Sequence, residues 1–151
     1  MNKLKEAIHP GTTTLELDEM AGKLVLEMGS DSAFKGYKGY EHTICASVNE
    51  QVVHGIPNNR NLKDGDILSI DIGVKMDGYS GDHAITIPLG KVGDDAKSLL
   101  RFCEEALWKG IEKAYAGNRL FDISNAIQVH AESAGFSVVR VYVCLLYTSD
   151  A

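Results

Sequence analysis

Two aspartates, Asp71 and Asp82, lie in one short run of alternating apolar residues that predicts two β-strands. The pair Asp77-Gly78 between them is typical of a two-residue hairpin turn. Such a turn sets Gly73 opposite Asp82 and Asp71 opposite Ala84. Because side chains alternate along a strand, both carboxylates then lie on one face. Diagonal neighbours of this kind are about 7–8 Å apart at the backbone.

Two anions held so close on rigid strands repel each other, and divalent cations bound between carboxylates would relieve that repulsion. The spacing alone also fits a hairpin with a solvated outer face, where aspartates are ordinary. The other face of the hairpin is apolar and is expected to pack on a core; it carries Ile70, Ile72, Val74, Ile85 and Ile87.

Helical and strand patterns surround this hairpin. Thr13 and Glu16 form a capping-box pattern at the start of an amphipathic helix that Gly29 ends. Residues 30–42 are rich in Gly, Ser and aromatics and predict a loop. Strands are predicted at 43–49, 52–53, 66–75, 79–89 and 136–143, and further helices at about 94–117 and 122–134. The order predicts an α+β fold in which helices cover one face of an antiparallel sheet.

Composition narrows the class of protein. The 151 residues carry a net charge of −6, with 44% apolar and 24% charged residues. These values are typical of a single globular domain, and they argue against a nucleic-acid surface. No apolar run is long enough to span a membrane, and the first residues lack the apolar core of a secretory signal. Three unpaired cysteines without a Cys-x-x-Cys motif favour a cytoplasmic protein with free thiols.

Several motifs occur in order at family-specific separations: Phe34–Tyr40, Cys45–Asn49, Ser47–Pro57, Gly65–Gly73 and Asp77–Asp82. Together they resemble the type I methionine aminopeptidases, and the resemblance runs from about Ile8 to about Arg140. It implies a pita-bread fold, the creatinase/aminopeptidase fold of two similar halves. Residues 1–140 would form the N-terminal part of one metallo-aminopeptidase catalytic domain, with its antiparallel sheet covered by helices.

The resemblance assigns chemistry to three residues. In the family, two divalent metal ions are held by two hairpin aspartates, here Asp71 and Asp82, and by a His and two Glu of the second half. Cobalt, manganese, iron and zinc all suit such ligands. His54 matches the histidine that contacts the scissile region of the substrate and donates a hydrogen bond as charge develops. Without the resemblance, His54 would be interpreted as a turn histidine bonded to backbone.

Aromatic and sulfur-containing residues match the pocket for the methionine side chain, which suits a flexible thioether. This substrate-binding set, which also takes in His54, consists of Phe34, Tyr37, Tyr40, Cys45 and His54. Alternatively, the aromatics only pin their glycine-rich loop to the sheet. Asn49 and Gln51 match a loop that binds a monovalent cation, mainly through backbone oxygens.

The implied function is removal of the N-terminal methionine from nascent polypeptides near the ribosome. A cytoplasmic monomer is expected, without direct nucleic-acid or membrane contact. An Xaa-Pro-type pita-bread peptidase and a non-catalytic pita-bread binding protein are the alternatives. The motif Val53–Pro57 and the absence of an extra N-terminal domain favour methionine, and retention of Asp71, Asp82 and His54 argues against a binding protein.

The chain departs from the family pattern at two places. Ser80 stands where relatives commonly have a histidine between the tyrosine and the glycine of the hairpin. Residues 141–151 do not match, and we interpret them as a non-family tail of artefactual origin. The remaining His and two Glu ligands would follow Arg140, so the 151-residue chain alone is expected to have little or no peptidase activity. His42, His83 and His130 are interpreted as structural, and His42 has no predicted partner.

Overall fold

The computed structural model describes residues 1–140, which form two compact units, Met1–Gly93 and a second unit that begins at Asp94. The predicted tail at 141–151, and the last three residues of the strand predicted at 136–143, lie outside the described residues. None of the helices in the described part is long and apolar enough to cross a membrane.

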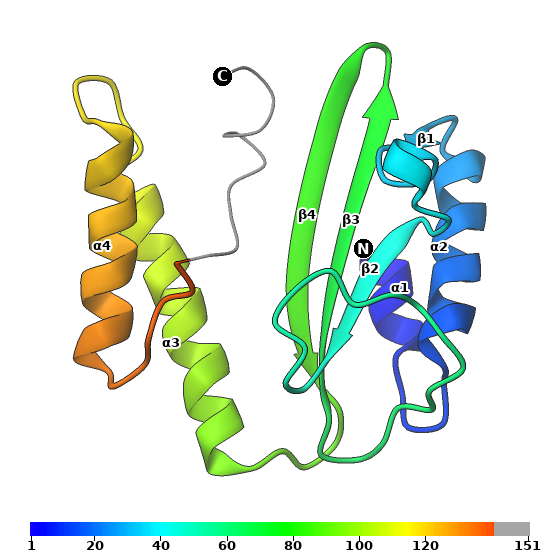
Figure 1. Cartoon of the computed structure of the whole chain (residues 1–151), viewed down its shortest axis with the longest axis horizontal. Coiled ribbons are helices and arrows are strands. Elements are labelled where there is room, and N and C mark those ends of the chain that lie inside the picture. Colours follow the sequence, from blue (N-terminus) through cyan, green and yellow to red (C-terminus); the bar gives the residue numbers. More distant parts are fainter. Residues whose placement is uncertain (141–151) are drawn as a thin grey trace. The chain divides into compact units, whose positions relative to one another are not determined.

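The first unit contains one antiparallel sheet (Figure 1). Its strands are β1 (Asp31–Ser32), β2 (Ile44–Val48), β3 (Ile67–Met76) and β4 (Tyr79–Pro88). β4 pairs with β3 over its whole length, so β2 and the short β1 pair with the opposite edge of β3. β3 is therefore the central strand, and the residues it carries have neighbours on both sides.

The β3–β4 hairpin confirms the predicted register. Asp71 pairs with Ala84 and Gly73 with Asp82. Both turn residues have left-handed backbones, with φ of 52° at Asp77 and 84° at Gly78. Two successive positive φ values define a type I′ turn, which matches the right-handed twist of the strands.

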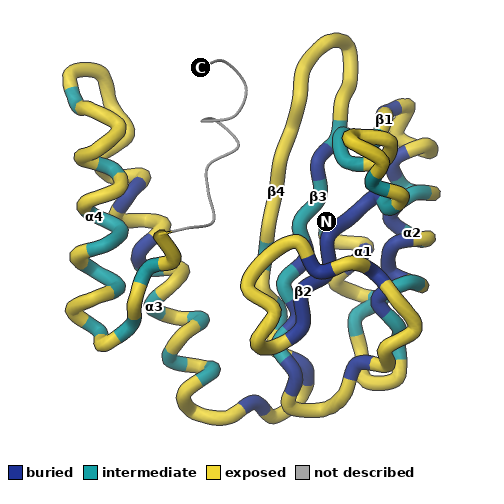
Figure 2. Tube along the Cα trace, in the orientation of Figure 1, coloured by how far each residue is buried: buried dark blue, intermediate teal, exposed yellow. Residues whose placement is uncertain are grey.

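The core of this unit lies between the sheet and two helices, α1 (Asn2–Ala7) and α2 (Thr14–Glu27). α2 begins with the predicted capping box, in which Thr13 and Glu16 each accept the backbone N–H of the other. Alternate residues of β2 and β3 face these helices. Figure 2 shows β2 as buried, whereas β4 is largely exposed. The core consists of Leu4, Leu17, Ala21, Ile44, Ala46, Val48, Leu62, Leu68, Ile70 and Leu89.

The second unit is a helical hairpin of α3 (Asp94–Ile111) and α4 (Leu120–Ser133). The helices approach closely at Gly110, where an added Cβ would lie 2.8 Å from the side chain of Ile127. His130 contacts Glu105 across the pair at 2.9 Å. α3 ends six residues earlier than the predicted Gly117, because hydrogen bonds to the third preceding residue tighten the chain after Ile111 and turn it toward α4.

One strand prediction is wrong, and a second is wrong over the residues that the structure describes. Val52 and Val53 are exposed and lie in an irregular loop, where the valines have no strand to pair with. Residues 136–140 are also irregular, since β-branched residues form a strand only beside a partner edge. Three short elements were not predicted: α1, β1 and the 3₁₀ turn at Tyr37–Gly39 within the loop at 30–42.

Candidate metal and substrate site

The carboxylates of Asp71 and Asp82 lie on the face of the hairpin away from the core. The pKa of Asp71 is raised from 3.8 to about 6, first by burial of the carboxyl and then by the charge of Asp82 and a hydrogen bond with it. His54 opposes this rise, so its imidazole is close enough to act on Asp71. The chain therefore holds two carboxylates together at an energetic cost, which a bound cation would offset.

Cys45 joins the pair from the neighbouring strand. It is paired directly with Asp71 across β2 and β3, so the thiol and the carboxylate are cross-strand neighbours on one face. Cys45 is 8% exposed, and its pKa is raised, chiefly by burial and also by the charge of Asp71. The phenol of Tyr40 lies beside this thiol and donates a hydrogen bond to the carbonyl of Ile44 at 2.8 Å. The wall formed by Cys45 and Tyr40 is therefore largely apolar.

Phe34 packs over Gly73, the residue opposite Asp82. A Cβ added at Gly73 would lie 2.6 Å from the Phe34 ring, so the ring occupies the space that a side chain would fill. Two hydrogen bonds hold the segment there: the Ala33 N–H donates to the Gly73 carbonyl at 2.8 Å, and the Phe34 N–H donates to the Ser32 hydroxyl at 3.1 Å. Gly73 thus admits an aromatic ring next to the aspartate pair.

His54 lies in the loop that follows β2 and has a left-handed backbone with φ of 57°. This conformation costs a residue with a side chain about 1–2 kcal/mol. The next residue, Gly55, is fixed to β2, since the Ala46 N–H donates to its carbonyl at 2.8 Å and its own N–H donates to the Ser47 hydroxyl at 2.9 Å. The imidazole of His54 is exposed, and its charge lowers the pKa of Asp71.

The structure brings five of the predicted site residues to one place: Phe34, Cys45, His54, Asp71 and Asp82, with Tyr40 behind Cys45. It does not bring Tyr37 to this group. The Tyr37 ring is 57% exposed, and its described contact is with Lys38, whose ammonium lies 5.5 Å from the ring centre.

Asn49 and Gln51 use their side chains within the loop. Asn49 donates to Asp66 at 2.8 Å and accepts the Ile67 N–H at 2.9 Å, and Gln51 accepts the Val48 N–H at 2.9 Å. Only their backbone oxygens remain available to a cation. Their part in a monovalent-cation site stays a prediction.

Sequence reasoning missed the partner of His42. Its ring lies 2.8 Å from the carboxylate of Asp18 on α2, and the other oxygen of Asp18 accepts the N–H groups of Thr43 and Ile44 at 2.7 and 3.0 Å. Asp18 is 8% exposed, so this cluster ties α2 to the start of the strand that carries Cys45. A lone aspartate within an amphipathic helix was the available signal, but its partners lie more than twenty residues away.

A divalent metal fits the aspartate pair only in part. Asp71 and Asp82 supply hard carboxylate oxygens on adjacent rigid strands. Within residues 1–140, however, no cluster of three or more His, Cys, Asp or Glu side chains is arranged to hold a metal ion. The two carboxylates would therefore need further ligands to bind a metal tightly.

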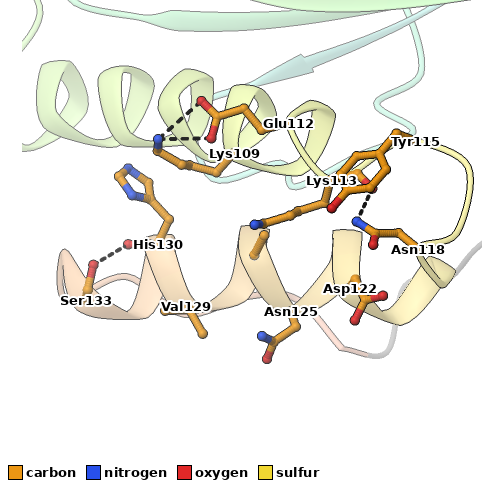
Figure 3. Close-up of a pocket in the computed structure, with 11 residues that line it drawn as sticks. Lys109, Glu112, Lys113, Tyr115, Asn118, Asp122, Asn125, Val129, His130 and Ser133 are labelled. Carbon is orange, nitrogen blue, oxygen red and sulfur yellow. Dashed lines mark hydrogen bonds and ion pairs between the residues drawn. The ribbon is translucent and has the colours of Figure 1, made fainter.

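The second unit has a hollow of about 560 Å³ between α3 and α4 (Figure 3). Some of its polar side chains bond within the unit: Lys109 pairs with Glu112 at 3.2 Å, and Asn118 donates to the Lys113 carbonyl at 2.9 Å. None of the residues that line it is among the predicted site residues.

Comparison with known proteins gives concordant results. The model of metallopeptidase family M24 matches residues 1–145. Methionine aminopeptidase 1 of Bacillus subtilis is 53% identical over 93% of this chain, and a methionine aminopeptidase of Clostridium perfringens is 50% identical over 95%. The chain spans 57% of the length of each of these relatives.

Solved structures of methionine aminopeptidases from Rickettsia prowazekii and Thermotoga maritima superpose with a TM-score of 0.91 each. They are 38% and 39% identical, and the match covers 93% and 94% of this chain but 57% of each of theirs. An Xaa-Pro dipeptidase from Bacillus anthracis superposes with a TM-score of 0.78 at 20% identity, which shows the fold alone. The fold is the pita-bread fold, and the chain corresponds to the N-terminal part of it.

Proposed function

The chain belongs to metallopeptidase family M24, and on that premise we propose that it supplies the N-terminal half-site of an enzyme that removes the N-terminal methionine from nascent polypeptides. One observation carries the proposal. A pair of close carboxylates, Asp71 and Asp82, lies across from the buried thiol of Cys45, and His54, held in a left-handed conformation, acts on Asp71 through its charge. The 53% identity to a curated methionine aminopeptidase supports this specificity.

In the proposed site, Asp71 and Asp82 are ligands of two divalent ions, together with ligands supplied from outside residues 1–140. Such ions would activate a water molecule and polarise the scissile carbonyl. The hard oxygen donors suit manganese, iron, cobalt or zinc. Asp71 must be deprotonated to bind a metal, so its raised pKa predicts that metal affinity falls steeply below about pH 6.

His54 is proposed to donate a hydrogen bond to the substrate next to the bond that is cleaved, where negative charge develops. Phe34, Cys45 and Tyr40 would contact the methionine side chain, because an aromatic and sulfur-lined wall suits a thioether. Tyr37 belongs to the same proposed pocket, although no described contact places it there. Asn49 and Gln51 would offer backbone oxygens to a monovalent cation.

We further propose that residues 1–140 are the N-terminal part of a single catalytic domain and that the complete enzyme acts as a cytoplasmic monomer near the ribosome. We also propose that residues 141–151 are a non-family tail, although the family model matches as far as residue 145. An Xaa-Pro-directed peptidase is the second candidate. The solved Xaa-Pro enzymes share the fold at about 20% identity, whereas the methionine aminopeptidases are about twice as similar, which favours methionine.

A chimera tests the proposal. Residues 1–140 replace the corresponding segment of the Bacillus subtilis relative, and release of methionine from Met-Ala-Ser is measured with Mn(II) or Co(II). We expect activity from the chimera and none from its Asp82→Asn variant, while a variant at an exposed aspartate, Asp31→Asn, remains active. A folded chimera that releases proline-adjacent residues but no methionine would overturn the assignment of substrate.

A further inference from the structure

The loop after β2 presents His54 in a conformation that a histidine does not favour by itself. Its φ of 57° lies in the left-handed region, and none of the described hydrogen bonds is made by the His54 side chain. The described hydrogen bonds that hold this part of the loop are made by the backbone next to His54. The described contacts of that backbone concentrate on Gly55.

Gly55 lies against β2 at very short range. A Cβ added there would lie 2.3 Å from the Ala46 carbonyl oxygen and 2.8 Å from the Ser47 Cα, so only glycine allows this approach. The Ala46 N–H donates to the Gly55 carbonyl at 2.8 Å, which is a backbone bond that any side chain at 46 would permit. The remaining bond depends on a side chain: the Gly55 N–H donates to the hydroxyl of Ser47 at 2.9 Å.

The position of Ser47 in β2 suits the hydrogen bond from the Gly55 N–H. It is 4% exposed, and β-strand alternation places it on the same face as Cys45 and therefore as Asp71. The bond from Gly55 is itself buried, so without the hydroxyl the amide would lose a partner that water does not readily replace. The peptide that joins His54 to Gly55 would then lose its described hydrogen bond, and only the next peptide would still be held, through the bond from the Ala46 N–H to the Gly55 carbonyl.

We infer that Ser47 is a positioning residue for His54: its hydroxyl accepts the Gly55 N–H and thereby holds His54 in its left-handed conformation. The inference rests on the proposed function for its catalytic meaning, but its geometric claim concerns this chain alone. Ser47 makes no contact with substrate in this account and acts only through the backbone of the loop.

The test uses the isotopically labelled, metal-free 151-residue chain in solution. Two NMR readouts are specific to the loop: hydrogen exchange of the Gly55 amide, and the strong intraresidue HN–Hα cross-peak of His54 that a positive φ produces. Ser47→Thr keeps the hydroxyl, and Ser47→Val has nearly the same shape without it. Ser69→Ala is the matched control, because its hydroxyl bonds a side chain of β4 and not the loop.

We expect Ser47→Val to speed exchange of the Gly55 amide about tenfold, which corresponds to about 1.4 kcal/mol, and to weaken the His54 cross-peak. Ser47→Thr and Ser69→Ala should keep both signals, with the amide spectrum of α2 unchanged in all variants. Because Thr and Val place the same volume in the site, a defect of packing would affect both. Equal behaviour of Ser47→Thr and Ser47→Val, or an unchanged Gly55 amide in Ser47→Val, would overturn the inference.

A kinetic arm separates this inference from the proposed function. In the chimera, Ser47→Val should lower kcat with KM nearly unchanged, and Ser47→Thr should restore it. If the NMR signals change as expected but His54→Ala leaves methionine release intact, the positioning role stands and the catalytic role of His54 is wrong. If the NMR signals do not change, the positioning role is wrong whatever the chimera does.

Discussion

Replacing Asp71 with asparagine should stabilise the metal-free chain at neutral pH while it removes a metal ligand. The pKa of Asp71 is raised from 3.8 to about 6 by burial and by the charge of Asp82. The folded chain therefore holds the proton of Asp71 more tightly than the unfolded chain does. As pH rises from about 4 to about 6, the folded state must give up that proton at a cost, so its free energy of unfolding falls.

The magnitude follows from the two pKa values. The difference between a pKa of 3.8 and one of about 6 corresponds to a loss of about 3 kcal/mol in the free energy of unfolding. Solvent screening at a half-buried site reduces this loss to on the order of 1–2 kcal/mol. Asparagine cannot ionise, so Asp71→Asn should match the wild-type stability near pH 4 and exceed it by this amount at pH 7. Asp82→Asn should give only part of the gain, because burial, the larger cause, remains.

The assay is urea unfolding between pH 4 and pH 8 with a chelator present. It should be followed by the methyl resonance of Ile70, which is buried in the core of the first unit, because the only tryptophan, Trp108, lies in the second unit. Asp31→Asn, at an exposed position on β1, is the control and should run parallel to wild type. If the free energy of unfolding of Asp71→Asn also varies with pH as that of wild type does, ionisation of Asp71 does not destabilise the folded chain and the reasoning is wrong.

Three further predictions concern the surroundings of the site. Gly73→Ala should displace the Phe34 ring and cost about 1–3 kcal/mol, measurable by thermal unfolding and by loss of the ring's cross-peaks; an unchanged ring position would contradict the packing. Iodoacetamide should modify the exposed Cys103 much faster than the buried Cys45, whose raised pKa also depletes its thiolate, and peptide mapping by mass spectrometry would reveal equal rates if this is wrong. Asp18→Ala should lower the free energy of unfolding by on the order of 3 kcal/mol, because two buried amides lose their acceptor, and Asp18→Asn should lose less.

The hairpin could be predicted from sequence because its signals are local. Asp77-Gly78 fixes the turn and alternation fixes the faces, so the register of Asp71 and Asp82 followed and was confirmed. The α2 capping box was equally local and was confirmed at Thr13. The α+β class and the M24 family likewise agree with the comparisons.

Most of the predictions that failed concern segments whose structure depends on contacts between residues far apart in the sequence. The stretch at Val52 and Val53 has strand propensity, but it lies in the irregular loop that Gly55 attaches to β2. His42 gained its partner, Asp18, only when α2 packed on the sheet. The helix α1 is six residues long with no side-chain cap, so neither periodicity nor capping could reveal it.

Binding of Mn(II) to the 151-residue chain tests most directly whether Asp71 and Asp82 form a metal half-site. Paramagnetic broadening detects weak binding, as expected for two ligands, and it reports position along the chain. The account predicts that substoichiometric Mn(II) first broadens amides around Asp71 and Asp82 in wild type and in Asp31→Asn, and that Asp71→Asn and Asp82→Asn abolish this selectivity. Equal broadening in all four proteins, or broadening centred elsewhere, would contradict the central claim.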